Sequence, residues 1–115
     1  MKAIKVAANA AVLGTCLVSI SVGAQQVPRF NVEAHCEQVA SISGDSSNML
    51  YNSCIDIEQT AYSGLKGQWS SLPANIQNHC RDVASVTGPG SYSLLESCVD
   101  MEVSAGNNRS EFSFD

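Results

Sequence analysis

The hydrophobic and polar positions of residues 31–61 recur without a gap in residues 75–105, at an offset of 44 positions. Fourteen of the 31 aligned positions are identical, and most of the other apolar positions exchange Ile, Val and Met. Self-similarity at a fixed offset is typical of a repeated supersecondary unit. The sequence therefore predicts two copies of one unit, repeat 1 over about residues 28–63 and repeat 2 over about residues 72–106.

Each copy contains two stretches in which apolar residues share one face of an α-helix, at spacings i, i+4 and i+7. In repeat 1 these are Val32, Cys36 and Val39, followed by Leu50, Cys54 and Ile57. A breaker separates the stretches, Gly44-Asp45-Ser46 in one copy and Gly88-Pro89-Gly90 in the other. The alternation expected of strands fits much less well. Each copy is therefore predicted to be an αα-hairpin.

Side-chain oxygens at the predicted helix starts can cap free backbone N–H groups. Gly64 and Gly67 in the linker, residues 62–73, are expected to weaken the end of the helix before them. The tail, residues 107–115, has no helical period, and we expect a loosely docked or disordered end whose two phenylalanines are available to cover an edge of the core. The candidate caps for the second helix of each copy are Asp45 or Ser47, and Ser91 or Ser93.

Residues 1–24 have the pattern of a secretory signal peptide. Lys2 and Lys5 precede a mostly apolar run, and small residues at Val22-Gly23-Ala24 predict cleavage after Ala24. Residues 25–115 would then form a single helical domain in the periplasm or outside the cell. Two alternatives are a retained membrane anchor, for which the run is short and diluted by polar residues, and a lipoprotein acylated at Cys16, whose preceding residues are a poor match.

Removal of this segment changes both the charge and the cysteine count. The full chain has a net charge of −5, and loss of Lys2 and Lys5 makes the remainder more acidic, which argues against nucleic-acid binding. Loss of Cys16 reduces the five cysteines to an even number, as in disulfide-linked exported chains.

The four remaining cysteines form Cys-x17-Cys twice, with the predicted turn at the midpoint of each spacing. Residues equidistant from the turn of an antiparallel hairpin lie opposite one another. The predicted pairs are therefore Cys36–Cys54 and Cys80–Cys98, one in each hairpin. The fold class that follows is all-α: two tandem disulfide-stapled αα-hairpins, with four helices, forming one small domain.

Two chemical roles for the cysteines compete with this structural one. A metal site could combine them with His35 and His79, but the C-x2–4-C clusters of zinc sites are absent. Adjacent His and Cys residues also project about 100° apart on a helix. A redox role would favour C-x-x-C, which does not occur. We therefore expect neither a metal nor another cofactor.

Several polar and aromatic residues are candidates for binding. His35 and His79 recur with the repeat, and we expect them at the hairpin interface. Tyr62 and Trp69 are candidate exposed anchors, with core packing as the alternative.

The sequence Cys-x-Asp-x-Glu also recurs, as Cys54-Ile55-Asp56-Ile57-Glu58 and Cys98-Val99-Asp100-Met101-Glu102. Two residues apart on a helix, the carboxylates point about 200° from each other and cannot act on one substrate atom. Solvated helix faces are expected, with Glu58 or Glu102 at the fringe of the core.

One further pattern spans residues 28–105. It consists of His35-Cys36, Cys54, Gln59-Thr60-Ala61-Tyr62, Leu65-Lys66, Trp69, Leu72-Pro73, Ser91-Tyr92, Leu95 and Cys98. In this pattern the chain resembles small secreted proteobacterial proteins with a duplicated Cys-x17-Cys helical hairpin and no assigned activity. The resemblance implies export and a paired-cysteine helical repeat.

No nucleophile–base motif, zinc-protease motif or glycine-rich phosphate loop occurs in the sequence. We therefore expect a non-enzymatic exported helical module of the cell envelope, with an interaction or structural role and no catalytic residues. Its partner would be another protein or an envelope component, and no retained membrane span is expected. The alternative is a small-ligand or metal-binding protein that uses the region around His35 and His79. A small hydrolase using Asp56 and Glu58 is a third option.

Overall fold

A computed structural model describes residues 26–86 and 88–115. The predicted signal peptide, its cleavage point and Cys16 lie outside these residues. Within them the chain is all-helical, as predicted, with no strand. The elements are α2 (Val32–Ala40), α3 (Asn48–Gln68), the 3₁₀ turn η1 (Trp69–Ser71), α4 (Ala74–Ala84) and α5 (Tyr92–Asn107).

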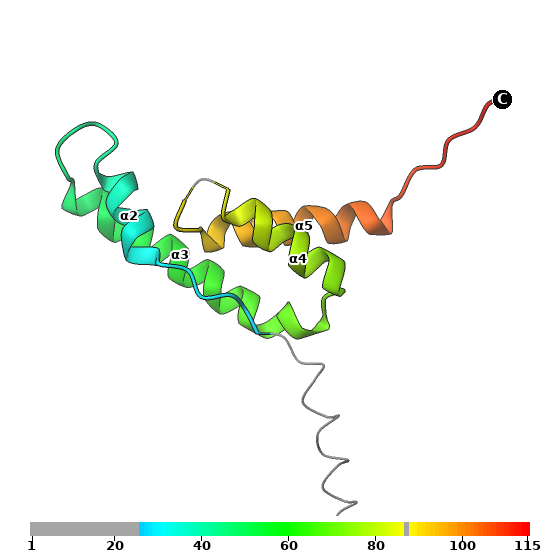
Figure 1. Ribbon diagram of the computed structural model, residues 1–115, viewed down its shortest axis with the longest axis horizontal. Helices are drawn as coiled ribbons and strands as arrows, with labels where there is room; N and C mark the ends of the chain where they lie inside the picture. Colours follow the sequence, from blue (N-terminus) through cyan, green and yellow to red (C-terminus); the bar gives the residue numbers. More distant parts are fainter. Residues whose placement is uncertain (1–25, 87) are drawn as a thin grey trace, which may run out of the picture.

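The four helices form two hairpins in tandem. Helix α2 packs on α3, α4 packs on α5, and α3 joins the hairpins by packing on α5 (Figure 1). A disulfide links each hairpin, Cys36–Cys54 in the first and Cys80–Cys98 in the second, with Cα atoms 5.5 Å apart in both. The predicted pairing is confirmed.

Local capping sets the start of the second helix in each hairpin. The Ser47 hydroxyl accepts a hydrogen bond from the Leu50 N–H at 3.2 Å, and the Ser91 hydroxyl accepts one from the Leu94 N–H at 3.3 Å. These bonds satisfy backbone donors that have no partner inside the helix. Of the candidate caps, the serines at 47 and 91 are therefore the ones used.

Helix α3 is longer than the sequence predicted, because it continues through both linker glycines to Gln68. A Cβ atom at Gly64 would lie 2.8 Å from the Glu96 carboxylate oxygen of α5. That oxygen is the end of a flexible side chain that can move aside, so the contact does not require glycine at this position. Both linker glycines are simply included in the helix, which does not end at them.

The largest buried cluster lies where α3 and η1 meet the second hairpin. Ala61, Leu65 and Trp69 supply the first side of this core. The second hairpin supplies Cys80, Ala84, Tyr92, Leu95, Cys98 and Val99. In the first hairpin Cys36, Ala40 and Cys54 are also buried but lie outside this cluster. The core is therefore concentrated at the junction between the hairpins.

The C-terminal tail does not take part in this core. Phe112 and Phe114 are 80% and 96% exposed and pack edge-to-face only on each other, with ring centroids 4.7 Å apart. Figure 1 shows the tail leaving the helical body at the end of α5. The two phenylalanines, available from the sequence to cover a core edge, do not do so, because α5 carries them away from the core. Among the described residues, no helix has both the length and the apolar character needed to cross a bilayer.

Candidate functional site

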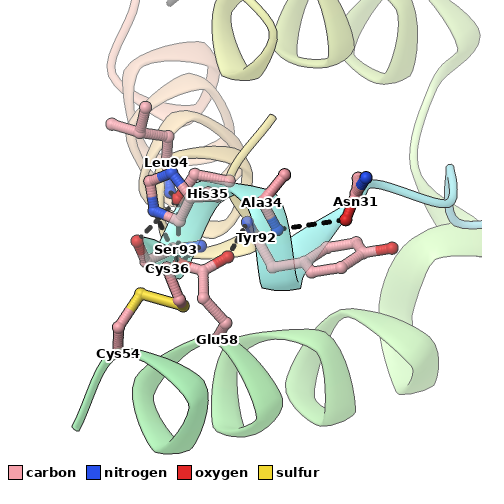
Figure 2. Close-up of a disulfide and its surroundings, with 10 residues drawn as sticks. Asn31, Ala34, His35, Cys36, Cys54, Glu58, Tyr92, Ser93 and Leu94 are labelled. Carbon is pink, nitrogen blue, oxygen red and sulfur yellow. Dashed lines mark hydrogen bonds and ion pairs between the residues drawn. A yellow bond between two sulfur atoms is a disulfide. The ribbon is translucent and has the colours of Figure 1, made fainter. Parts of the chain in front are cut away.

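The junction between the hairpins is built around one buried carboxylate. Glu58 of α3 is 2% exposed and points at the N-terminus of α5 (Figure 2). Its oxygens accept hydrogen bonds from the Ser91 hydroxyl at 2.9 Å and from the N–H groups of Tyr92 and Ser93 at 2.5 and 3.3 Å. The first N–H groups of a helix lack internal partners and form its positive end. Glu58 therefore fastens the second hairpin to the first.

A histidine from α2 approaches the same carboxylate. The Nε2 atom of His35 lies 3.9 Å from Oε2 of Glu58, and its side chain is 20% exposed (Figure 2). The neighbouring residue is Cys36, whose disulfide to Cys54 holds this part of α2 against α3. The disulfide therefore also positions the histidine at the junction.

The second hairpin contains the same pair in an open setting. His79 Nε2 lies 3.7 Å from Glu102 Oε2, and these side chains are 56% and 45% exposed. Each histidine thus meets the glutamate of its own hairpin, and no hydrogen bond or ion pair in the described chain links His35 with His79. Among the described residues, no group of three or more His, Cys, Asp and Glu side chains is placed to hold a metal ion.

The expectation of solvated carboxylates fits only part of the repeated Asp-x-Glu sequence. Asp56 and Asp100 are exposed, but Glu58 is wholly buried. Its place four residues after Cys54 was the sequence signal for a position near the core. The spacing from Cys54 could not show that the carboxylate binds the N-terminus of α5, because that helix end belongs to the other repeat. The hydrogen bonds to α5 give Glu58 a structural role.

Residues 26–31 form a strap that runs along α3 and contacts Tyr92, the first residue of α5 (Figure 1). The Tyr92 hydroxyl donates to the Pro28 carbonyl at 2.7 Å and accepts from the Phe30 N–H at 2.9 Å. The Phe30 and Tyr92 ring centroids are 4.8 Å apart. Gly90 has a φ of +99°, and a Cβ there would lie 2.5 Å from the Phe30 ring, so both the turn and the strap require glycine. Burial raises the pKa of Tyr92 above its usual value.

Two adjoining cavities lie between this strap and α3, each of about 360 Å³. Both are lined by Arg29 and Tyr62; the first also reaches Glu58, and the second reaches Lys66 and Trp69. The Lys66 Nζ atom lies 5.5 Å from the centre of the Tyr62 ring, a cation–π arrangement. Tyr62, a candidate from the sequence, therefore borders both cavities.

Trp69 is a core residue and not an exposed anchor, because it is 1% exposed and packs with Leu65 at the junction. Trp69 nevertheless lines the second cavity. The buried indole N–H has no hydrogen-bond partner among the described residues.

Three apolar positions are exposed in both copies of the repeat, and we call each set an apolar strip. The helical periodicity of the sequence predicted that two of these residues, Leu50 and Ile57, share the buried face of their helix with Cys54. The structure corrects this for Ile57, which is 58% exposed, as its counterpart Met101 is at 67%. The strips consist of Ile42, Leu50 and Ile57 in the first hairpin and Val86, Leu94 and Met101 in the second.

Comparison with known protein families, curated proteins and solved structures finds no match for this chain.

Proposed function

We propose that this chain is an exported, non-enzymatic helical module that binds a protein or another component of the cell envelope. The signal-peptide pattern of residues 1–24 supports export, and the two disulfides are consistent with an oxidising compartment. The proposed location is the periplasm or the extracellular space.

The repeated apolar strips are the observation that carries the binding role. Single exposed apolar residues are ordinary on protein surfaces. Here the same three positions are exposed in both hairpins. The exposed fractions are 81% for Ile42 and 76% for Val86, 36% for Leu50 and 40% for Leu94, and 58% for Ile57 and 67% for Met101. These positions remain exposed although the two helices of each hairpin pack on each other and α3 packs on α5. One chain thus presents the same apolar strip twice, and binding through both would strengthen attachment to a repeated partner.

Site-specific photo-crosslinking in the cells that make the protein tests this role. A crosslinking residue at position 57 and one at position 101 should each trap the same partner, because the two strips are equivalent. A crosslinking residue at Glu37, which is exposed on α2 outside the strips, is the control.

Charged substitutions in the strips provide the second arm. With the crosslinking residue moved to position 50 or 94 of the same strips, Ile57→Asp and Met101→Asp should each reduce the trapped partner, and the double variant should abolish it. The proposal fails if the strip positions trap nothing beyond what the control position traps, or if the double variant captures the partner as well as the wild type does.

A small-anion-binding protein is the second candidate function, and the cavities support it. Arg29 and Lys66 both line the second cavity, together with Trp69, in a chain that is otherwise acidic. Because Trp69 is the single tryptophan, its fluorescence reports on this cavity directly. Orthophosphate or succinate should change that fluorescence and raise the melting temperature. Replacing Arg29 and Lys66 by Gln should remove both effects, whereas Arg109→Gln, in the exposed tail, should not.

A further inference from the structure

The two hairpins are joined head to tail. Glu58 of the first hairpin holds the N-terminus of α5 in the second. A two-fold arrangement would also place Glu102 against the N-terminus of α3, but Glu102 is 45% exposed. The junction thus joins two different surfaces, an acceptor around the glutamate of one hairpin and a donor at the N-terminus of the second helix of the other. Each hairpin carries both surfaces, so one acceptor and one donor of the molecule remain unused.

The unused acceptor surface lies on the second hairpin. Glu102, His79 and Ala105 occupy the positions that Glu58, His35 and Ala61 hold in the first hairpin. The glutamate and histidine side chains are 45% and 56% exposed in the unused copy, compared with 2% and 20% in the occupied one. Ala105 is likewise exposed, whereas Ala61 is buried. The acceptor around Glu58 is therefore occupied by the N-terminus of α5, whereas the equivalent acceptor around Glu102 is not covered by any helix end of the described chain.

The unused donor surface is the N-terminal part of α3. Its Ser47 cap matches Ser91 of α5, with the same hydrogen bond to the third helical residue. Tyr51 and Ile55 are half-buried, and they take the positions of Leu95 and Val99, which are 0% exposed where α5 packs on α3. The donor helix end and its two apolar neighbours are thus accessible.

We propose that Glu102 of one molecule accepts the N-terminus of α3 of a second copy, so that the internal junction is repeated between molecules. Each added copy brings a new free acceptor, so the assembly grows head to tail and does not close at a dimer. Helix α5 ends at Asn107, so it has no counterpart of Leu65 and Trp69 beyond Ala105, and the contact buries less apolar surface than the internal junction. Association is consequently concentration-dependent and weaker than the internal junction.

This association does not depend on the apolar strips. At the internal junction Glu58 is buried while its neighbour Ile57 remains 58% exposed, and Leu94 of α5 remains 40% exposed. Failure of the envelope-partner experiment would therefore leave the head-to-tail contact untouched, and the reverse also holds.

Sedimentation velocity of the oxidised protein at increasing concentration is the test. The sedimentation coefficient should continue to rise beyond the value for a dimer. Glu102→Ala removes the acceptor, and Asn48→Glu places a carboxylate in the first turn of α3, where it stabilises that helix but repels Glu102. Each variant should weaken association about tenfold or more, since hydrogen bonds to charged groups are strong. Asp100→Ala, the same kind of change at an exposed position on the opposite side of α5 from Glu102, should associate like the wild type.

Mixing the two variants provides the decisive measurement. Asn48→Glu retains a working acceptor, and Glu102→Ala retains a working donor. An equimolar mixture should therefore form a one-to-one dimer that does not grow further. The proposal is overturned if the wild type stays monomeric at every concentration, if it stops at a dimer, or if the mixture forms no dimer although both variants keep the wild-type circular dichroism spectrum.

Discussion

The pairs His35–Glu58 and His79–Glu102 occupy equivalent positions in the two hairpins, yet only the first is enclosed. The side chain of Glu58 is 2% exposed and that of Glu102 is 45% exposed. In both hairpins a histidine nitrogen lies within 4 Å of the carboxylate, at 3.9 and 3.7 Å. The hairpin therefore builds the pair by itself, and the docking of a helix end decides whether the pair is buried.

The two disulfides show a parallel difference. Cys80 and Cys98 belong to the core cluster at the junction, whereas Cys36 and Cys54 lie outside it. The sequence separation is 18 in both pairs, so the loop that each disulfide closes has the same length. Any difference between them must therefore come from packing and not from loop entropy.

The largest expected effect is on unfolding after removal of the disulfide of the second hairpin. Cys80→Ala with Cys98→Ala should lower the free energy of unfolding by about 3 kcal/mol or more, because loop entropy and core packing are lost together. Urea denaturation measures this loss. Cys36→Ala with Cys54→Ala should instead open α2 locally, which amide hydrogen exchange detects. Equal global losses, without faster exchange in α2, would contradict this division.

The next effect compares the two glutamates directly. Glu58→Ala leaves buried N–H groups of α5 without an acceptor and should lower the free energy of unfolding by about 2 to 3 kcal/mol. Glu102→Ala changes an exposed side chain and should stay within the small range of surface substitutions, about 0.5 kcal/mol. Denaturation at low protein concentration keeps self-association out of the measurement. Similar losses in the two variants would show that Glu58 does not hold the junction.

The smallest effect concerns the strap that contacts the start of α5. Because burial raises the pKa of Tyr92, folding favours its neutral form. The stability that this provides is complete below the usual tyrosine pKa of about 10 and is lost as the pH rises through the higher folded value. The wild type should therefore lose stability above about pH 10. Tyr92→Phe should be less stable at neutral pH, by less than about 1.5 kcal/mol, and should show a flatter alkaline slope.

The sequence predicted the features that depend on local spacing. Helical periodicity and the repeat predicted the hairpins, and the midpoint symmetry of the cysteines predicted both disulfides. The serines that begin α3 and α5 were among the candidate caps. All of these depend on residues within one repeat, where spacing alone indicates which side chains meet.

The features that the sequence did not reveal depend on distant residues. Glu58 meets Ser91 and Tyr92 across separations of 33 and 34 residues, and Tyr92 meets Pro28 across 64. Periodicity within a helix indicates a face but not what packs on it. For this reason Glu58 was expected at the fringe of the core, and Trp69 was weighed as an exposed anchor.

The strap also has a consequence for the order in which the chain folds. Phe30 emerges early during synthesis, but the tyrosine hydroxyl that holds it lies 62 residues further along the chain. The first hairpin can close its own disulfide without that tyrosine, because both cysteines belong to it. The strap and the Glu58 junction, however, must wait for the second hairpin, because such non-local contacts form only after their distant partners are available. Folding of the domain is therefore completed at its N-terminal end, after the C-terminal hairpin has arrived.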